Sequence, residues 1–442
     1  MIDLVVRGGT VVTPDGRRRA DVAIEDGRVV DVSPEVTAGR SEIDARGLFV
    51  LPGLIDVHLH FNEPGRTDWE GGATGSRALA AGGGTLFFDM PLNSTPCTVN
   101  AREVDRKRAA LEASSITDFG LWGGLVPGSV GDMADMAGRG VVGFKAFMSS
   151  SGLPEFPRAD DVTLFDGLRE AARLGLPVAV HAESEELTRG LAERITARTV
   201  RAFLDSRPVV AELEAIQRAL LLAREAHAPL HIVHVSSGRG VAMAAEARAH
   251  GVDVSIETCP HYLFFTDEDV ERLGAVAKCA PPLRRSGERD ALWDELLRGH
   301  VDMVASDHSP APPSMKSGDF VSAWGGIAGV QSTLAVLLDK GWHERRLPLE
   351  RITTLVAAEP ARRFRIADKG SLTPGLDADM VLVDLDACFT LAADDLYQRH
   401  KMSPYLGSSF RGAVRRTIRR GETIFLDGQI TASAGGRLVR PC

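Results

Sequence analysis

The middle of the chain alternates short apolar runs with longer amphipathic stretches. The apolar runs predict eight β-strands, at residues 53–61, 84–91, 118–125, 141–148, 177–183, 229–236, 252–260 and 301–308. Between them, stretches such as 161–175 and 209–226 place apolar residues at helical spacing. This alternation indicates parallel strands, and eight units predict an α/β fold, a (β/α)₈ TIM barrel over residues 52–365. An open doubly wound sheet is the alternative, and it would gather its site at one switch point.

Both chain ends have a different pattern, in which apolar and polar residues alternate at strand spacing. The pattern holds over residues 3–12, 20–32, 377–386 and 415–430, with Asp-Gly turn signals at 15–16, 26–27 and 427–428. Because chain termini often lie close together, we expect residues 1–51 and 366–442 to form one small β-sandwich domain. Two separate β-caps are the alternative.

Composition narrows the class of protein. The chain has 442 residues, 44% of them hydrophobic and 25% charged, which are globular values. Its formal net charge of −9 gives it no general attraction to nucleic acid or to an anionic membrane. The five cysteines are odd in number and form no CxxC motif, and the first residues lack the pattern of a signal peptide. We therefore expect a reduced, cytoplasmic protein.

Candidate metal-site residues recur at the carboxyl ends of the predicted barrel strands. They lie in or directly after the first, fourth, fifth, sixth and eighth apolar runs, and are His58, His60, Lys145, His181, His234 and Asp307. Imidazole and carboxylate are the ligands expected for zinc and its first-row neighbours. Each residue alone has an ordinary explanation, but barrel enzymes place their sites at these strand ends. The set exceeds what one metal needs and suits a two-metal hydrolase.

Strand geometry separates the histidines. His58 and His60 are two residues apart, so their side chains point to the same face. His231 and His234 are three apart, so only one of them should point into the barrel, and His234 is nearer the carboxyl end of its strand. His261, after the seventh strand, is a candidate supporting group behind the ligands.

The motifs, in their order along the chain, resemble those of the cyclic amidohydrolases, the family of dihydroorotases, hydantoinases and allantoinases. The resemblance covers essentially the whole chain and rests on PGLIDVHLHFNEPG, DMPLNSTP, GFKAFMSSSG, VHAES, HVSS, ETCPHYL, KCAPPLR and SDHSP. Other strings are similar to the allantoinase branch of the family, namely FNEPGR, MPLNS, SDHSPAPPSMK with AWGGIAG, and RHKMSPY.

The resemblance implies a ligand for each position of a binuclear centre. It implies that His58, His60 and Asp307 bind one divalent ion and that His181 and His234 bind the other. Lys145 would bridge them as N6-carboxylysine, because an ammonium cannot bind a cation whereas a carbamate can. Zinc is the expected metal, with cobalt, manganese and nickel as alternatives. Asp307 would be the general base, and the expected substrate contacts are Asn62, Asn93, Cys279, Ala280 and Gly325.

The resemblance also implies a reaction, the hydrolysis of a cyclic amide. Dihydroorotases have HxHxR, where the Arg pairs with the substrate carboxylate, whereas this chain has Asn62. A neutral ring such as that of allantoin, opened to allantoate, therefore fits better than dihydroorotate. Hydantoinase or dihydropyrimidinase activity, dihydroorotase activity, and a catalytically silent scaffold are the alternatives. The family also implies a small-molecule substrate and a homotetramer. A phosphate loop at 236–240 is disfavoured, since the segment lacks the Lys-Ser/Thr ending.

Overall fold

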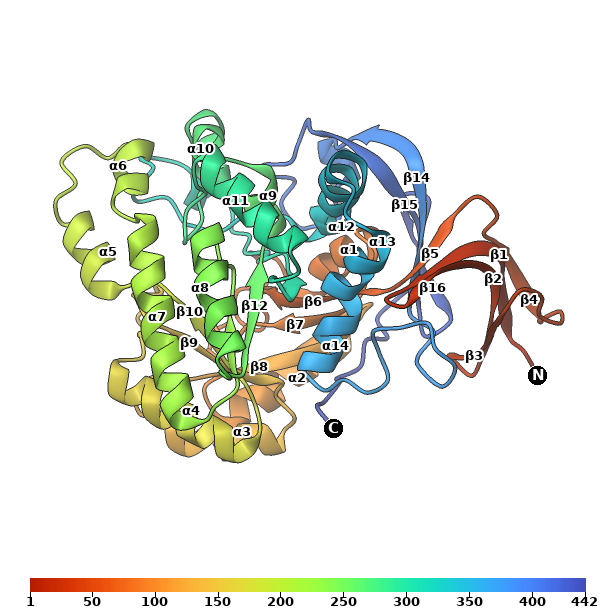
Figure 1. The fold of residues 1–442 in the computed structure, drawn as a ribbon, viewed down its shortest axis with the longest axis horizontal. Helices are drawn as coiled ribbons and strands as arrows, with labels where there is room; N and C mark the ends of the chain where they lie inside the picture. Colours follow the sequence, from red (N-terminus) through yellow and green to blue (C-terminus); the bar gives the residue numbers. More distant parts are fainter.

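The computed structural model describes residues 1–442 and has two parts (Figure 1). A barrel surrounded by helices forms the larger part, and a curved sheet at one side of it forms the smaller part. Strands from both chain ends lie together in the smaller part, coloured red and blue in the figure.

All eight strands predicted for the middle of the chain are present, and they are parallel. They are β6 (Leu54–Leu59), β7 (Gly84–Asp89), β8 (Asp118–Gly124), β9 (Gly143–Phe147), β10 (Val178–His181), β11 (Leu230–Ile232), β12 (Val254–Thr258) and β13 (Met303–Val304). They pair in sequence order from β6 to β13. A parallel bridge between Leu59 and His308 joins the two edge strands beyond β13. The barrel prediction is confirmed, and the open-sheet alternative is wrong.

The predicted helices cover the outside of the barrel. The longer ones are α1 (Gly72–Ala81), α2 (Ala101–Ser114), α4 (Asp161–Leu174), α5 (Glu185–Ala192), α7 (Val209–Ala226), α8 (Gly238–Ala249) and α11 (Ser286–Leu297). The shorter ones are α3 (Met133–Gly138), α6 (Val200–Asp205), α9 (Pro260–Phe264), α10 (Asp267–Leu273), α12 (Thr333–Val336), α13 (Leu349–Thr353) and α14 (Glu359–Arg363). In α4, the Asp160 side chain accepts a hydrogen bond from the Thr163 backbone, and Gly175 ends the helix with a left-handed φ of 66°. These local signals favour a helix that begins and ends at these residues.

Aromatic rings fill the lower half of the barrel. Trp122 of β8 and Phe88 of β7 each meet the ring of Phe364 edge to face, with centroids 5.2 Å apart. All three side chains are buried. Because packing fills this part of the interior, the carboxyl ends of the strands are the expected place for a site, as in other barrels.

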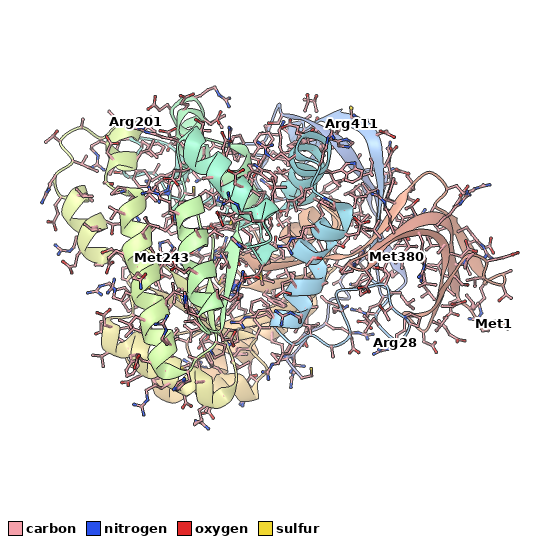
Figure 2. The ribbon with its side chains drawn as sticks, viewed as in Figure 1. Met1, Arg28, Arg201, Met243, Met380 and Arg411 are labelled. Carbon is pink, nitrogen blue, oxygen red and sulfur yellow. The ribbon has the colours of Figure 1, made fainter.

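The smaller part is one nine-stranded sheet that takes strands from both chain ends. Its strands are β1 (Leu4–Thr13), β2 (Gly16–Glu25), β3 (Arg28–Ser33), β4 (Ser41–Asp44), β5 (Phe49–Pro52), β14 (Met380–Thr390), β15 (Ser409–Arg419), β16 (Glu422–Leu426) and β17 (Gln429–Ile430). Strand β14 pairs antiparallel with β5, so Met380 and Arg28, from opposite ends of the sequence, both lie in this part (Figure 2). A shared β-unit is confirmed, and the alternative of separate caps is wrong. The domain limits 1–51, 52–365 and 366–442 stay a prediction.

Ion pairs join the two parts at the base of the barrel. The ammonium of Lys369 lies 2.7 Å from Asp118 of β8, 2.8 Å from Asp377 and 2.7 Å from Asp379, and all four residues are buried or nearly so. These ion pairs therefore fix the β-unit to the amino end of β8, which is the end of that strand opposite the predicted site. None of the helices combines the length and apolarity needed to cross a lipid bilayer.

Candidate metal centre

A cleft of about 370 Å³ opens at the carboxyl ends of the barrel strands. It brings together five of the six predicted metal ligands, His58, His60, His181, His234 and Asp307. Four of the five predicted substrate residues also line it, Asn93, Cys279, Ala280 and Gly325. Residues from widely separated stretches of the chain thus share one cavity.

The first group of donor atoms comes from β6, the residue after it, and the loop after β13. The Nε2 atoms of His58 and His60 lie 3.3 and 3.6 Å from the same carboxylate oxygen of Asp307. The imidazole rings are 5.7 Å apart, centre to centre, so both face the carboxylate as the HxH spacing predicts. Two imidazole nitrogens and one carboxylate oxygen converging in this way form a donor set for a first-row divalent metal.

The second group consists of two histidines. Nδ1 of His181, the last residue of β10, lies 3.0 Å from Nε2 of His234. The ring of His234 is also 5.3 Å from the ring of His58, centre to centre, so the two groups adjoin.

Lys145 lies in β9 and is completely buried. Its ammonium nitrogen has no hydrogen-bond partner, and the ring of Phe147 is 5.1 Å away. Burial lowers the pKa of Lys145 to about 8, because the charged form loses its hydration. The neutral amine, which is the form that reacts with carbon dioxide, is thereby made accessible near neutral pH. An unpartnered buried amine beside candidate metal ligands fits a modified lysine better than a free cation.

Two buried carboxylates, which the sequence did not predict, lie behind the histidines. Oε1 of Glu257, in β12, lies 2.8 Å from Nδ1 of His58, and Oε2 of Glu183 lies 2.9 Å from Nε2 of His181. A carboxylate only accepts hydrogen bonds, so each histidine carries its proton on that nitrogen and leaves the other nitrogen's lone pair facing the cleft. Their only signal in the sequence is an acidic residue within or directly after an apolar strand, in SIETC and VHAES.

The prediction that His231 points away from the barrel is wrong. Its Nε2 lies 3.0 Å from Oε2 of Glu257, and its ring stacks on Trp122 inside the barrel. Strand alternation fails here because β11 ends at Ile232 and His234 has a left-handed φ of 41°. Both side chains consequently face the interior, with His234 at the cleft and His231 beneath it.

The backbone at the cleft is held in an uncommon conformation. Asn62, Asn93, His234 and Asp307 have φ values of 62°, 69°, 41° and 44°. Residues other than glycine seldom adopt this left-handed region, and they persist there where the surrounding structure imposes it. Of these four residues, Asn93, His234 and Asp307 have side chains that line the cavity.

Asn62 differs from the other predicted substrate residues in its location. It is fully buried, does not line the cleft, and its amide lies 3.4 Å from the carbonyl oxygen of Pro310. The amide of Asn93 lies 3.4 Å from the hydroxyl of Ser309 at the cleft wall. His261 is buried with neither ring nitrogen bonded, and it forms a compact group with Cys259 and Asp307. Substrate contact by Asn62 stays a prediction.

Known proteins resemble this chain in both sequence and structure. Residues 49–424 match the amidohydrolase family. The chain is 64% identical to an allantoinase of Solibacter usitatus, with 100% of this chain and 97% of that protein covered, and 59% identical to one of Rubrobacter xylanophilus, with 99% and 98% covered. Among solved structures, the L-hydantoinase (dihydropyrimidinase) of Arthrobacter aurescens superposes with a TM-score of 0.97 at 34% identity, over 100% of both chains.

These likenesses bear on the metal centre. The family and its hydantoinase members imply a binuclear site for divalent metals. The donor chemistry fits such a site, since imidazole nitrogens and a carboxylate converge from two sides and Lys145 is buried without a partner. The chain belongs to the amidohydrolase family.

Proposed function

We propose that this protein hydrolyses the ring amide of allantoin to give allantoate. The observation that carries the proposal is the 64% identity, over the whole chain, to a protein named allantoinase. The cleft supports it, because it combines candidate metal ligands with a wall of mostly uncharged groups that suits a neutral ring.

The proposed metal centre assigns each donor atom to an ion. His58, His60 and Asp307 would hold the first ion, and His181 and His234 would hold the second. Lys145, as N6-carboxylysine, would supply a carboxylate shared between them. Zinc is the proposed metal because it favours nitrogen donors together with carboxylate, and cobalt, manganese and nickel accept the same ligands.

When bound, a pair of divalent ions polarises the substrate carbonyl and lowers the pKa of water, which supplies a nucleophile near neutral pH. Asp307 is the proposed general base. Although burial opposes ionisation, the electrostatic effect of the neighbouring His58 and the contact with His60 hold the pKa of Asp307 well below its usual range. Asp307 is therefore ionised and free to accept a proton, and its role is to take the proton from the attacking water and return it to the ring nitrogen as the amide bond breaks.

The remaining cleft residues hold the ring. Asn93 offers an amide, and the segments at Cys279–Ala280 and Gly325 offer backbone groups that line the cavity. Backbone donors and acceptors suit a substrate whose ring alternates carbonyl and N–H groups.

The test is an assay of the purified, metal-loaded protein for allantoate formed from allantoin, with Asp307→Asn as the control. We expect one allantoate per allantoin consumed and strong loss of turnover in the control. A wild-type protein that carries a full complement of metal and leaves allantoin intact would refute the proposed activity.

Hydantoinase activity is the second candidate, favoured by the close superposition on the Arthrobacter aurescens enzyme. Dihydroorotase activity and a silent scaffold are less favoured, the latter because every candidate ligand is present. A homotetramer and a cytoplasmic location also remain proposals. Light scattering coupled to size-exclusion chromatography would test the first.

A further inference from the structure

Two long cationic side chains, those of Arg207 and Lys278, line the cleft. They differ in the number of hydrogen-bond donors that remain free. The Lys278 ammonium donates to the backbone carbonyls of Phe320, Val321 and Ala323, at 2.9, 2.9 and 2.6 Å. All three N–H groups of this ammonium are therefore occupied by hydrogen bonds within the protein. The Arg207 guanidinium has one protein partner, since Nη1 donates to Glu183 at 2.5 Å. Its Nε and Nη2 groups have none.

Arg207 is held firmly enough to present these free donors. Its guanidinium lies over the ring of Phe203, 5.6 Å from the centroid, and its backbone carbonyl accepts a hydrogen bond from Arg284. Its side chain is 21% exposed, while that of Glu183 is completely buried. The planar fork is thus fixed at one edge by a buried carboxylate. The other edge, Nε and Nη2, has no hydrogen-bond partner in the protein, on a side chain that lines the cleft.

The free edge of Arg207 belongs to a side chain that is one residue removed from a candidate metal ligand. Glu183 joins Arg207 to Nε2 of His181, at 2.5 and 2.9 Å. A ring whose amide is held among the metal ligands would therefore extend its substituent toward the guanidinium.

Charge decides which substituent fits. Arg207 and Glu183 form a neutral pair, so an added carboxylate would lie beside an existing one and gain little. A neutral carbonyl oxygen still accepts both N–H groups of the free edge. Allantoin differs from plain hydantoin by an exocyclic ureido group, whose carbonyl is a strong acceptor.

We propose that Arg207 is a specificity-determining residue that donates Nε–H and Nη2–H to the ureido carbonyl of the substrate. The inference rests on the proposed function. The competing role is a positioning one, in which Arg207 acts only through Glu183 on His181 and affects every substrate alike.

The experiment compares two substrates that share a ring and differ in the ureido group, allantoin and hydantoin. The variants are Arg207→Met and Arg207→Lys, the second because it keeps the charge and loses the planar fork. Arg201→Met is the matched control, since Arg201 belongs to the same segment but lies at the surface, paired with Asp267 and Glu271 (Figure 2). The readouts are kcat/KM for each substrate, the Ki of hydantoin as a competitor of allantoin, metal content and thermal unfolding.

We expect both Arg207 variants to lose about 10- to 100-fold in kcat/KM for allantoin, the usual range for hydrogen bonds from a charged donor. The Ki of hydantoin, its turnover where measurable, and the metal content should change by less than about threefold. The control should behave as wild type. Equal losses on both ligands, or loss of metal, would overturn the proposal in favour of the positioning role, and unchanged allantoin turnover would overturn it outright. Failure of the proposed function would appear separately, as wild-type protein inactive on allantoin.

Discussion

Glu257 lies directly behind His58, with its Oε1 atom 2.8 Å from Nδ1 of the imidazole. The same carboxylate accepts hydrogen bonds from the His234 backbone and the His231 ring, both at 3.0 Å. Although burial opposes its ionisation, the electrostatic effect of the neighbouring His58 and the hydrogen bonds from His231 and His58 hold the pKa of Glu257 at about 2. One buried anion therefore orients residues from both groups of donor atoms.

Replacing Glu257 with Gln tests this orientation. The amide accepts from one histidine but must donate to another, which forces an imidazole into the wrong tautomer. We expect metal affinity to fall by roughly 10- to 100-fold. Competition with a chelator, followed by metal analysis, measures the change. Glu295→Gln is the matched control, because Glu295 also bonds a histidine, His300, away from the cleft. Similar metal affinity in both variants would show that Glu257 has no such role.

Lys145→Ala tests the bridging lysine. The variant should lose metal and activity together, because the proposed carbamate supplies ligands that alanine lacks. A short carboxylic acid such as formate should restore part of both, whereas formamide, equal in size but neutral, should restore neither. Metal content and allantoin turnover are measured with each additive. Full metal occupancy with near-normal turnover in the unsupplemented variant would rule out the bridge.

Asp307→Asn tests the general base. The amide is nearly isosteric, so the fold should persist while turnover falls roughly 100-fold or more, as expected for loss of general base catalysis. Loss of a metal ligand would add to the effect, so kcat is measured at saturating metal. Turnover above about a tenth of wild type would exclude the role, since such losses are typically far larger.

Lys278→Met tests the wall of the cleft. The ammonium joins three carbonyls of the segment 320–323, and methionine keeps its length without its donors. We expect faster hydrogen exchange in that segment and a higher KM for allantoin, with the metal content unchanged. Mass spectrometry of exchanged peptides makes the comparison. Unaltered exchange would show that other contacts hold the wall.

Local signals in the sequence predicted most of the fold. The eight strands stand out because strands buried on both faces read as continuous apolar runs. Helix α7 was predicted at residues 209–226 as observed, since its apolar residues recur at helical spacing. Both residues of the Asp26-Gly27 turn have positive φ, 49° and 75°, as this hairpin turn requires.

Other features depend on contacts between distant residues, and the sequence does not reveal them. Glu257 meets His58 across 199 residues, so no spacing rule links them. The error over His231 arose because the end of β11 is set by tertiary packing and by the backbone of His234, and neither has a local signal. Asn62 is likewise buried beside a residue distant in sequence, since its amide lies near the carbonyl oxygen of Pro310.

The central claim, a preference for allantoin, is tested most directly by the kcat/KM of the wild-type protein on allantoin and dihydroorotate side by side. Dihydroorotate would bring a carboxylate to a cleft where Glu183 already neutralises Arg207 and Asp307 is ionised. The position that is arginine in dihydroorotases is the uncharged Asn62, which does not line the cleft. An uncompensated buried charge costs several kcal/mol, so we expect allantoin to be preferred by roughly 100-fold or more. Equal or better efficiency on dihydroorotate would contradict the account.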